Sequence, residues 1–272
     1  MERGTYYLYG TTDKNCWTGP FVGFDVYQSS DLEEWVEPHP AFRPSEDFWA
    51  DQNFWAPEVF RYGDRYYMFA SFKKEGVARG TQILAAAHPH GPFVPHSSGP
   101  VTPRDWECLD GTLFVDDDNT PWMVFCHEWV QVSDGEILAV PLNPELTSAV
   151  DQPQLLFRAS EAPWSRPIVR NGKKHFVTDG PFLWKTKNGE LVMLWSSMGT
   201  QGYAMGIARS TTGSILGPWV QDPKPIYEQD GGHGMMFRTF DGRLILTFHT
   251  PNNTPDERPI FLELNEDLSV KV

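Results

Sequence analysis

The sequence predicts an all-β protein, and specifically a five-bladed β-propeller. Turn residues followed by a short, strongly apolar strand occur five times, at residues 6–9, 66–69, 122–125, 191–194 and 244–247. A second apolar stretch follows each of these strands at short range, and no segment repeats its apolar residues with the period of a helix. A strand unit that recurs at intervals of about 50–70 residues is typical of repeat architectures, of which the propeller is a β form.

The elements of each unit follow in a constant order. Turn residues precede the apolar strands at Arg3-Gly4, Gly63-Asp64, Asp118-Asn119, Asn188-Gly189 and Asp241-Gly242. The second strands are expected at 22–27, 83–87, 137–142, 205–208 and 260–264. Each unit is therefore predicted to be an inner strand, an apolar strand, a second hairpin partner and an outer strand. We expect one propeller domain over residues 1–272, whose first unit begins without its inner strand.

Composition limits the partners and the compartment. The formal net charge is −14, which repels phosphate backbones and anionic headgroups, so nucleic-acid and membrane partners are not expected. The start of the chain has no signal-peptide pattern, which predicts a cytoplasmic protein, or a secreted one if an upstream segment was removed. The three cysteines, Cys16, Cys108 and Cys126, fit no metal spacing and are expected to be free thiols.

Polar residues stand just upstream of four of the five apolar strands. They are Glu58, Asp110, Asp179 and His233. In a propeller the inner strands line a central channel, so residues near the starts of these strands are expected to converge at its mouth. A concave site with convergent titratable groups is the default candidate for function.

The segments that contain these residues resemble glycoside hydrolase family 43. The resemblance rests on residues 55–59 (Trp-Ala-Pro-Glu-Val), 109–118 (Leu-Asp-Gly-Thr-Leu-Phe-Val-Asp-Asp-Asp), 178–182 (Thr-Asp-Gly-Pro-Phe) and 232–235 (Gly-His-Gly-Met). It covers essentially the whole chain. It implies a five-bladed propeller and an inverting glycosidase that removes terminal xylosyl or arabinofuranosyl residues from plant hemicellulose or its oligosaccharides.

The resemblance also implies roles for individual residues. Asp110 matches the aspartate that tunes the protonation of the acid and helps to orient it. Asp179 matches the general acid, which is normally a glutamate in a Glu-Gly-Pro motif. His233 matches a histidine that binds a calcium ion in the channel in many relatives. The general base of the family would lie about a dozen residues before Tyr6, so it matches no residue of this chain.

Two of these assignments have alternatives in the sequence. Aspartate is one methylene shorter than glutamate, and a proton donor misplaced by about 1 Å can cost on the order of 100-fold in rate. Glu128, in Cys-His-Glu-Trp at 126–129, is therefore the alternative acid. Asp51 is the alternative base, although its surroundings favour a loop.

Sugar contacts are expected from aromatic and polar residues near the strand ends. Indole rings stack on the apolar C–H faces of sugars, which indicates Trp55, Trp129 and Trp195 among the 11 tryptophans. Further substrate contacts are expected from Glu58, His127 and Arg238. The predicted function is inverting hydrolysis. The rival functions are sugar binding without turnover, because the base is not in the chain, and phosphorolysis, which would need a basic phosphate site.

Overall fold

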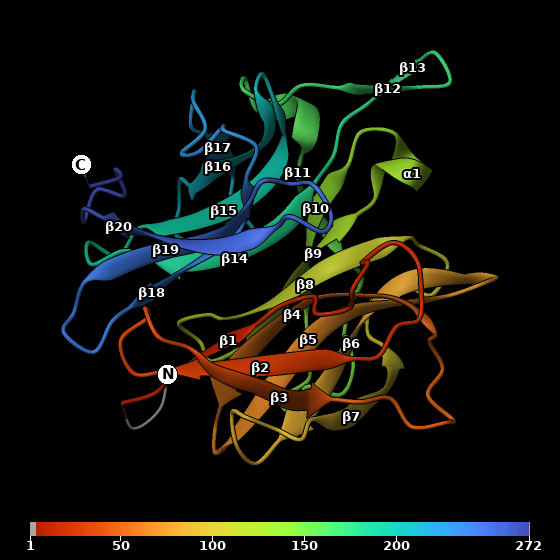
Figure 1. The fold of residues 1–272 in the computed structure, drawn as a ribbon. Coiled ribbons are helices and arrows are strands. Elements are labelled where there is room, and N and C mark those ends of the chain that lie inside the picture. Colours follow the sequence, from red (N-terminus) through yellow and green to blue (C-terminus); the bar gives the residue numbers. More distant parts are fainter. Residues whose placement is uncertain (1–3, 272) are drawn as a thin grey trace. The chain divides into compact units, whose positions relative to one another are not determined.

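The computed structural model describes residues 4–271, whose regular secondary structure consists almost entirely of strands (Figure 1). These residues form five antiparallel sheets of three or four strands and one separate two-stranded hairpin. Each predicted repeat supplies one sheet, and neighbouring strands in a sheet are consecutive in the sequence. The all-β prediction is confirmed. Among residues 4–271, no helix is long and apolar enough to cross a membrane.

Two compact units divide the chain. Unit 1 comprises Met1–Gly111 with Leu142–Ala149, and unit 2 comprises Thr112–Pro141 with Val150–Val272. Unit 1 contains two whole sheets, one of β1 (Tyr6–Tyr9), β2 (Phe24–Ser29) and β3 (Val36–Phe42), the other of β4 (Gln52–Tyr62), β5 (Arg65–Lys74), β6 (Val77–Ala86) and β7 (Val94–Pro100). Its core is aromatic: the rings of Phe24, Phe42 and Phe54 each lie 5.0–5.8 Å from the ring of Phe72.

Unit 2 contains the other sheets, except that β8 (Cys108–Val115) begins in unit 1. The third sheet joins β8 to β9 (Pro121–His127), β10 (Glu136–Pro141) and β11 (Gln154–Arg158). The fourth contains β14 (Asp179–Lys185), β15 (Leu191–Gly199), β16 (Gly202–Ser210) and β17 (Trp219–Gln221). The fifth contains β18 (Gly232–Arg238), β19 (Leu244–Thr250) and β20 (Arg258–Leu264). Within the third sheet, α1 (Trp129–Val132) connects β9 to β10. Between the third and fourth sheets lie a 3₁₀ turn (Ala159–Glu161) and the hairpin of β12 (Ile168–Arg170) and β13 (Lys173–His175).

An irregular residue recurs near the start of the inner strands. In β14 the pairing of Asp179 with Ser196 is followed by that of Phe182 with Leu194, so β14 holds one extra residue, which makes a β-bulge. The same shift occurs in β4 and β18. The residues with positive φ at this position are Ala56 (47°), Asp110 (56°), Gly180 (51°) and His233 (56°). Left-handed backbone is costly for residues other than glycine, so the surroundings must stabilise it.

A hydroxyl group from the preceding repeat accepts a hydrogen bond from the amide of three of these residues. The amide of Ala56 donates to Thr11 Oγ1 (3.1 Å), that of Asp110 to Ser71 Oγ (2.9 Å) and that of His233 to Ser196 Oγ (2.8 Å). Ser71 and Ser196 are fully buried. Each bond therefore satisfies the amide of a left-handed residue, and the bonds of Ser71 and Ser196 also join the start of one sheet to the second strand of the sheet before it.

Removal of one such hydroxyl should weaken the fold. We expect Ser196→Ala to lower the free energy of unfolding by about 1–3 kcal/mol, because the amide of His233 loses its acceptor. Ser196→Cys should cost less, because sulfur is a weak acceptor. The chain already has a cysteine at the position equivalent to Ser196 in another repeat. This is Cys126 in β9, which lies six residues after Thr120 at the end of its hairpin turn, as Ser196 lies six residues after Glu190. Urea unfolding of the two variants tests this, and an alanine variant as stable as the wild type would contradict it.

Candidate functional site

Asp179 opens β14 and is half-buried. The hydroxyl of Tyr203, from β16, donates to Asp179 Oδ2 at 3.0 Å. Tyr203 is itself 3% exposed, and its ring stacks on that of His249 with 5.7 Å between centroids and 20° between planes. The carboxylate of Asp179 is therefore held by a side chain that has little freedom to move.

His233 lies beside Asp179 in unit 2. A β carbon at Gly180 would lie 2.7 Å from Cδ2 of His233, so the ring packs directly against the glycine that follows Asp179. The structure thus brings together two of the residues that the sequence singled out. They come from the inner strands of neighbouring sheets, β14 and β18.

Burial controls the charge of the two histidines. It lowers the pKa of His233, and the nearby charge of Asp179 partly opposes this effect. The pKa of His249 is also lowered, first by burial and then by His233. Both rings are therefore neutral near pH 7 and offer hydrogen-bonding atoms rather than positive charge.

Asp230 fixes the loop ends around this group. Its Oδ1 accepts from the amide of Tyr203 at 3.1 Å, and its Oδ2 accepts from the amide of Asn252 at 3.2 Å. Asp230 therefore ties the start of β16 to the loop after β19, and so places Tyr203.

His127 ends β9 and Glu128 follows it directly, also in unit 2. Glu128 is 6% exposed and precedes α1, where its carbonyl accepts from the amides of Gln131 and Val132. His127 is equally buried, with Nδ1 3.1 Å from Glu136 Oε2 and Nε2 2.8 Å from Gln131 Oε1. Both ring nitrogens of His127 thus have protein partners.

Asp110 and Glu58 lie in unit 1. Asp110 is 7% exposed; Ser71 holds its amide, and Thr81 Oγ1 accepts from the next amide, that of Gly111, at 3.1 Å. Glu58 is half-buried in β4, two residues after the left-handed Ala56. The backbone around Asp110 is thus fixed by two buried hydroxyls.

Trp55 belongs to a cluster in unit 1. The guanidinium of Arg79 lies 4.2 Å from the ring centroid of Trp55, and Trp17 meets the ring edge-on at 5.0 Å. The indole N–H donates to the carbonyl of Cys16 at 2.6 Å. One face of Trp55 is therefore covered by Arg79.

Comparison with known proteins then decides the family. Residues 1–264 match the family described as Glycosyl hydrolases family 43. The chain belongs to this family. A solved endo-arabinase from Bacteroides thetaiotaomicron VPI-5482 is 42% identical, with a TM-score of 0.89 over 96% of this chain and 90% of that one. A thermostable family-43 glycoside hydrolase, 23% identical, shares the fold with a TM-score of 0.82 over 100% of this chain and 90% of that one.

Curated relatives cover less of the chain. An extracellular endo-α-(1→5)-L-arabinanase of Bacillus subtilis (strain 168) is 22% identical over 160 residues, which is 50% of this chain and 49% of that protein. A xylosidase/arabinosidase 43A of Humicola insolens is 32% identical over 82 residues, 30% of this chain and 24% of that protein. These matches thus span about half, or less, of the relatives. The predicted family, the glycosidase class and the five-bladed β-propeller are confirmed.

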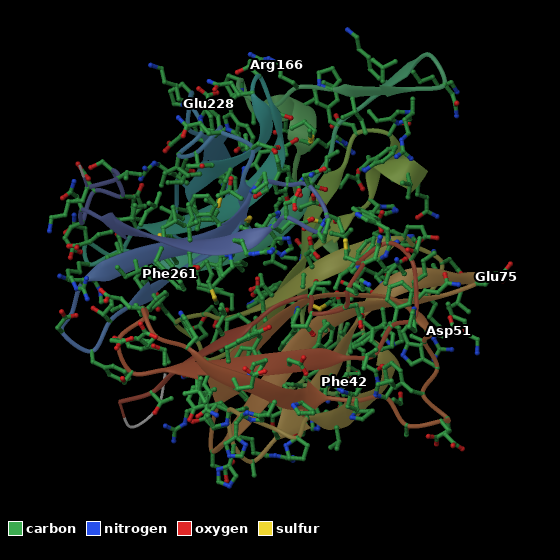
Figure 2. The ribbon with its side chains drawn as sticks, in the orientation of Figure 1. Phe42, Asp51, Glu75, Arg166, Glu228 and Phe261 are labelled. Carbon is green, nitrogen blue, oxygen red and sulfur yellow. The ribbon has the colours of Figure 1, made fainter. Side chains whose placement is uncertain are left out.

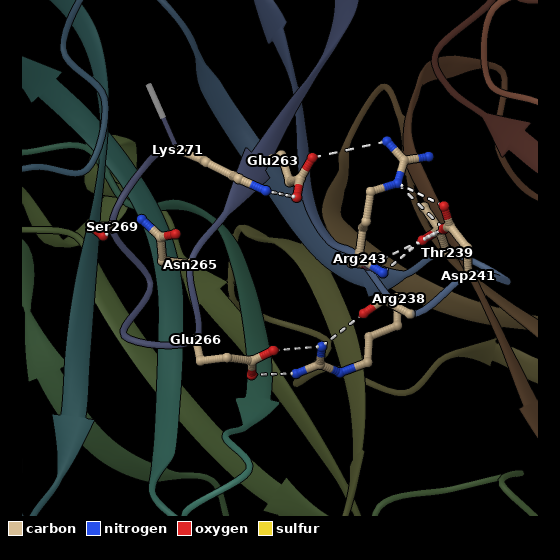
Figure 3. A network of polar contacts seen from close by, with 10 residues as sticks. Arg238, Thr239, Asp241, Arg243, Glu263, Asn265, Glu266, Ser269 and Lys271 are labelled. Carbon is tan, nitrogen blue, oxygen red and sulfur yellow. Dashed lines mark hydrogen bonds and ion pairs between the residues drawn. The ribbon is translucent and has the colours of Figure 1, made fainter.

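Two predicted substrate contacts of this family 43 protein are wrong. Trp195 is fully buried, packs on Trp164 at 4.8 Å and donates to Gln221 at 2.9 Å, so it belongs to the core. Arg238 stands at the far end of β18, five residues or about 16 Å beyond His233. There it pairs with Glu266 through both guanidinium nitrogens (Figure 3).

The four upstream residues do not occupy one repeat position. Asp110 and His233 both have left-handed backbone, and that of His233 lies at the bulge of β18. Asp179, by contrast, precedes the left-handed residue of its strand by one residue, and Glu58 follows that of its strand by two. Asp51 is exposed, immediately before β4 (Figure 2), and its amide donates to the carbonyl of Lys73. The convergence of all four residues at one channel mouth stays a prediction, as does a role for Asp51.

The predicted calcium ion finds few protein ligands. Calcium takes six to eight oxygen ligands. Within residues 4–271, no group of three or more His, Cys, Asp or Glu side chains is arranged to hold a metal. A cage of side chains therefore does not fit, and no step below depends on the ion.

Sequence reasoning missed Tyr203, His249 and Asp230. His249 could have been found from the repeat, because it is the counterpart of Ser196. His249 lies six residues after Arg243 at the end of a hairpin turn, and Ser196 lies six residues after Glu190 at the end of another. Tyr203 had no such signal, because only the pairing of β15 with β16 brings it to Asp179.

His233 and His249, which are both partly buried, should make stability depend on pH. Their pKa values are lower in the folded chain than the usual 6.5. At pH values between the folded and the unfolded pKa, the unfolded chain therefore binds more protons, so the free energy of unfolding rises with pH in that range. We expect the free energy of unfolding to fall as the pH is lowered below about 6.5, by about 1.4 kcal/mol for each unit of pKa difference.

The variant His249→Gln isolates this effect. Its stability relative to the wild type should improve as the pH falls from about 7.5 to about 5, because it lacks one buried imidazole. His90→Gln, at an exposed position, is the matched control. Urea unfolding at several pH values measures both, and parallel curves for His249→Gln and the wild type would contradict the expectation.

Proposed function

We propose that this protein hydrolyses α-L-arabinofuranosyl linkages of arabinan or its oligosaccharides. The likeness to the 42% identical endo-arabinase, which extends over 96% of the chain, supports this substrate. The B. subtilis relative also has an arabinanase name. The observation in the site that carries the chemical part of the proposal is the hydrogen bond from Tyr203 to Asp179 beside neutral His233.

The proposed reaction is a single displacement with inversion. One carboxylic acid protonates the glycosidic oxygen, and a carboxylate on the opposite side removes a proton from the water that attacks the anomeric carbon. The C–O bond to the leaving sugar breaks as the bond to water forms. We assign the acid role to Asp179 and, as the family resemblance implies, the tuning role to Asp110.

The geometry favours Asp179 over Glu128 for the acid. The hydroxyl of Tyr203 fixes one oxygen of Asp179, Oδ2, by a hydrogen bond of 3.0 Å. The ring of His233 packs on the next residue and limits how far the strand can shift. These constraints keep the shorter aspartate side chain in one position, which a proton donor requires.

A second candidate function is removal of terminal xylosyl or arabinofuranosyl residues. The 32% identity to the Humicola insolens xylosidase/arabinosidase favours it, although only over 82 residues. The sizes of the products distinguish the two functions, because cleavage of internal bonds yields oligosaccharides from linear arabinan, whereas cleavage at chain ends yields only arabinose.

Hydrolysis of linear arabinan tests the proposal and the acid. We expect oligosaccharide products, and we expect Asp179→Asn to lower kcat by about 100- to 10,000-fold, the usual contribution of a general acid. Glu128→Gln, an equally small change, should lower kcat far less. Full activity of Asp179→Asn would transfer the acid role to Glu128, whereas binding of arabinan without turnover by the wild type would favour the rival function of sugar binding.

Tyr203→Phe tests how Asp179 is positioned. We expect kcat to fall on the order of 10- to 100-fold with little change in KM, because the substrate still binds while the carboxyl group loses its donor. The hydroxyl stabilises the charged carboxylate, so its loss should move the alkaline limb of the pH–rate profile to higher pH. Tyr227→Phe, the same chemical change on a ring that packs on Phe248, is the control. An unchanged pH profile would contradict the role of Tyr203.

A further inference from the structure

The hairpin of β12 and β13 stands apart from the repeat sheets. It lies between the third and fourth sheets in the sequence, and in Figure 1 it extends away from β14–β17. Asn171 and Gly172 at its tip have φ of 50° and 72°, which is the two-residue turn that favours tight hairpins. Residues 169–174 are all exposed. A two-stranded hairpin is marginal in water, so this one needs an anchor.

Trp129 of α1 provides the anchor. The guanidinium of Arg170 lies 5.1 Å from its ring centroid, and the ring of His175 lies 5.2 Å from it. The base of the hairpin is fixed by backbone bonds of Phe176 with Ser133 and Gly135, both 2.9 Å. Trp129, predicted to stack on sugar, thus holds Arg170 and His175 and orients the hairpin.

The charge of the hairpin is opposite to that of the chain. Residues 166–174 contain Arg166, Arg170, Lys173 and Lys174 and no acidic residue, whereas the chain has 22 basic and 36 acidic residues. All four side chains are exposed, and Arg166 is labelled at the surface in Figure 2. None of the four forms an ion pair with a carboxylate of residues 4–271. Their positive charge is therefore not neutralised by these carboxylates, although Arg166 also donates to the carbonyls of Pro163 and Ser165 and Arg170 lies over Trp129. Lys173 and Lys174 are the cations best placed to meet an external anion.

The hairpin is also close to the proposed acid along the chain. His175 ends β13 four residues before Asp179, a separation of at most about 14 Å in extended chain. The base of the hairpin therefore lies within the length of a few sugar units of the start of β14.

We propose that the basic hairpin binds a negatively charged stretch of the glycan, with carboxylates of the uronate class, next to the neutral linkage that is cut. This inference rests on the proposed glycosidase function. Neutral sugars need no cations, whereas a uronate chain must overcome the repulsion of a protein with net charge −14. Lysine and arginine form charge-assisted hydrogen bonds with carboxylates. Nucleic acid fits less well, because four cations supply few phosphate contacts.

Binding of polygalacturonate tests the proposal without turnover. We expect the wild type to bind it at about 20 mM salt and to lose binding at about 300 mM, because such contacts are screened. Lys173→Ser combined with Lys174→Ser should weaken binding at least about fivefold. Lys74→Ser combined with Lys224→Ser removes the same charge from exposed positions elsewhere and should change it less than about twofold.

Other outcomes would overturn the proposal. The proposal fails if the wild type does not bind polygalacturonate at low salt, or if the two double variants bind it with equal affinity. It also fails if the wild type binds duplex DNA as tightly as polygalacturonate. Hydrolysis of neutral linear arabinan is measured in parallel and should be equal in all three proteins. If the wild type bound polygalacturonate but did not hydrolyse linear arabinan, the proposed function would be refuted and the proposed binding site on the hairpin would still be supported.

Discussion

Much of this structure depends on one hydrogen bond that recurs between neighbouring sheets. A hydroxyl group on a middle strand accepts from the amide of the residue that turns left-handed in the next inner strand, as Ser71 does for Asp110 and Ser196 for His233. Without that acceptor, a buried amide and a strained backbone would coincide at the same residue. The bond therefore determines where each inner strand begins and which side chains stand at its entrance.

The proposed chemistry follows from this arrangement. His233 occupies the left-handed position itself, while Asp179 stands one residue ahead of the equivalent Gly180. Because the glycine leaves room for the imidazole, the two groups from different sheets come together, and burial keeps the imidazole neutral. Tyr203 of β16 then completes the set through its hydrogen bond to Asp179.

The fold was predictable because its signals are local. Turn residues and apolar strands recur in order, so residues 6–9 and 191–194 could be recognised as counterparts and form β1 and the start of β15. The site was predictable only where a residue stands beside a repeated strand, as Asp179 and His233 do. Tyr203 escaped because its contact depends on strand register, which sequence pattern does not fix to one residue. The predictions for Trp195 and Arg238 were wrong for two different reasons. The sequence did not show that the ring of Trp195 faces the core, and it did not show at which end of β18 Arg238 stands.

The contact between Gly180 and His233 couples two motifs that stand far apart in the sequence. The imidazole fills the space that any β carbon at position 180 would need, and the main chain of His233 closes it further at 3.0 Å. The residue that fits at position 180 therefore depends on the residue at position 233. A smaller side chain at 233 would remove the contact with the ring but not the contact with the main chain. The glycine of the Asp-Gly-Pro motif is thus required because the histidine leaves no room for a side chain. If replacement of Gly180 abolished activity, the cause would be a displaced His233 and not the loss of a reactive group.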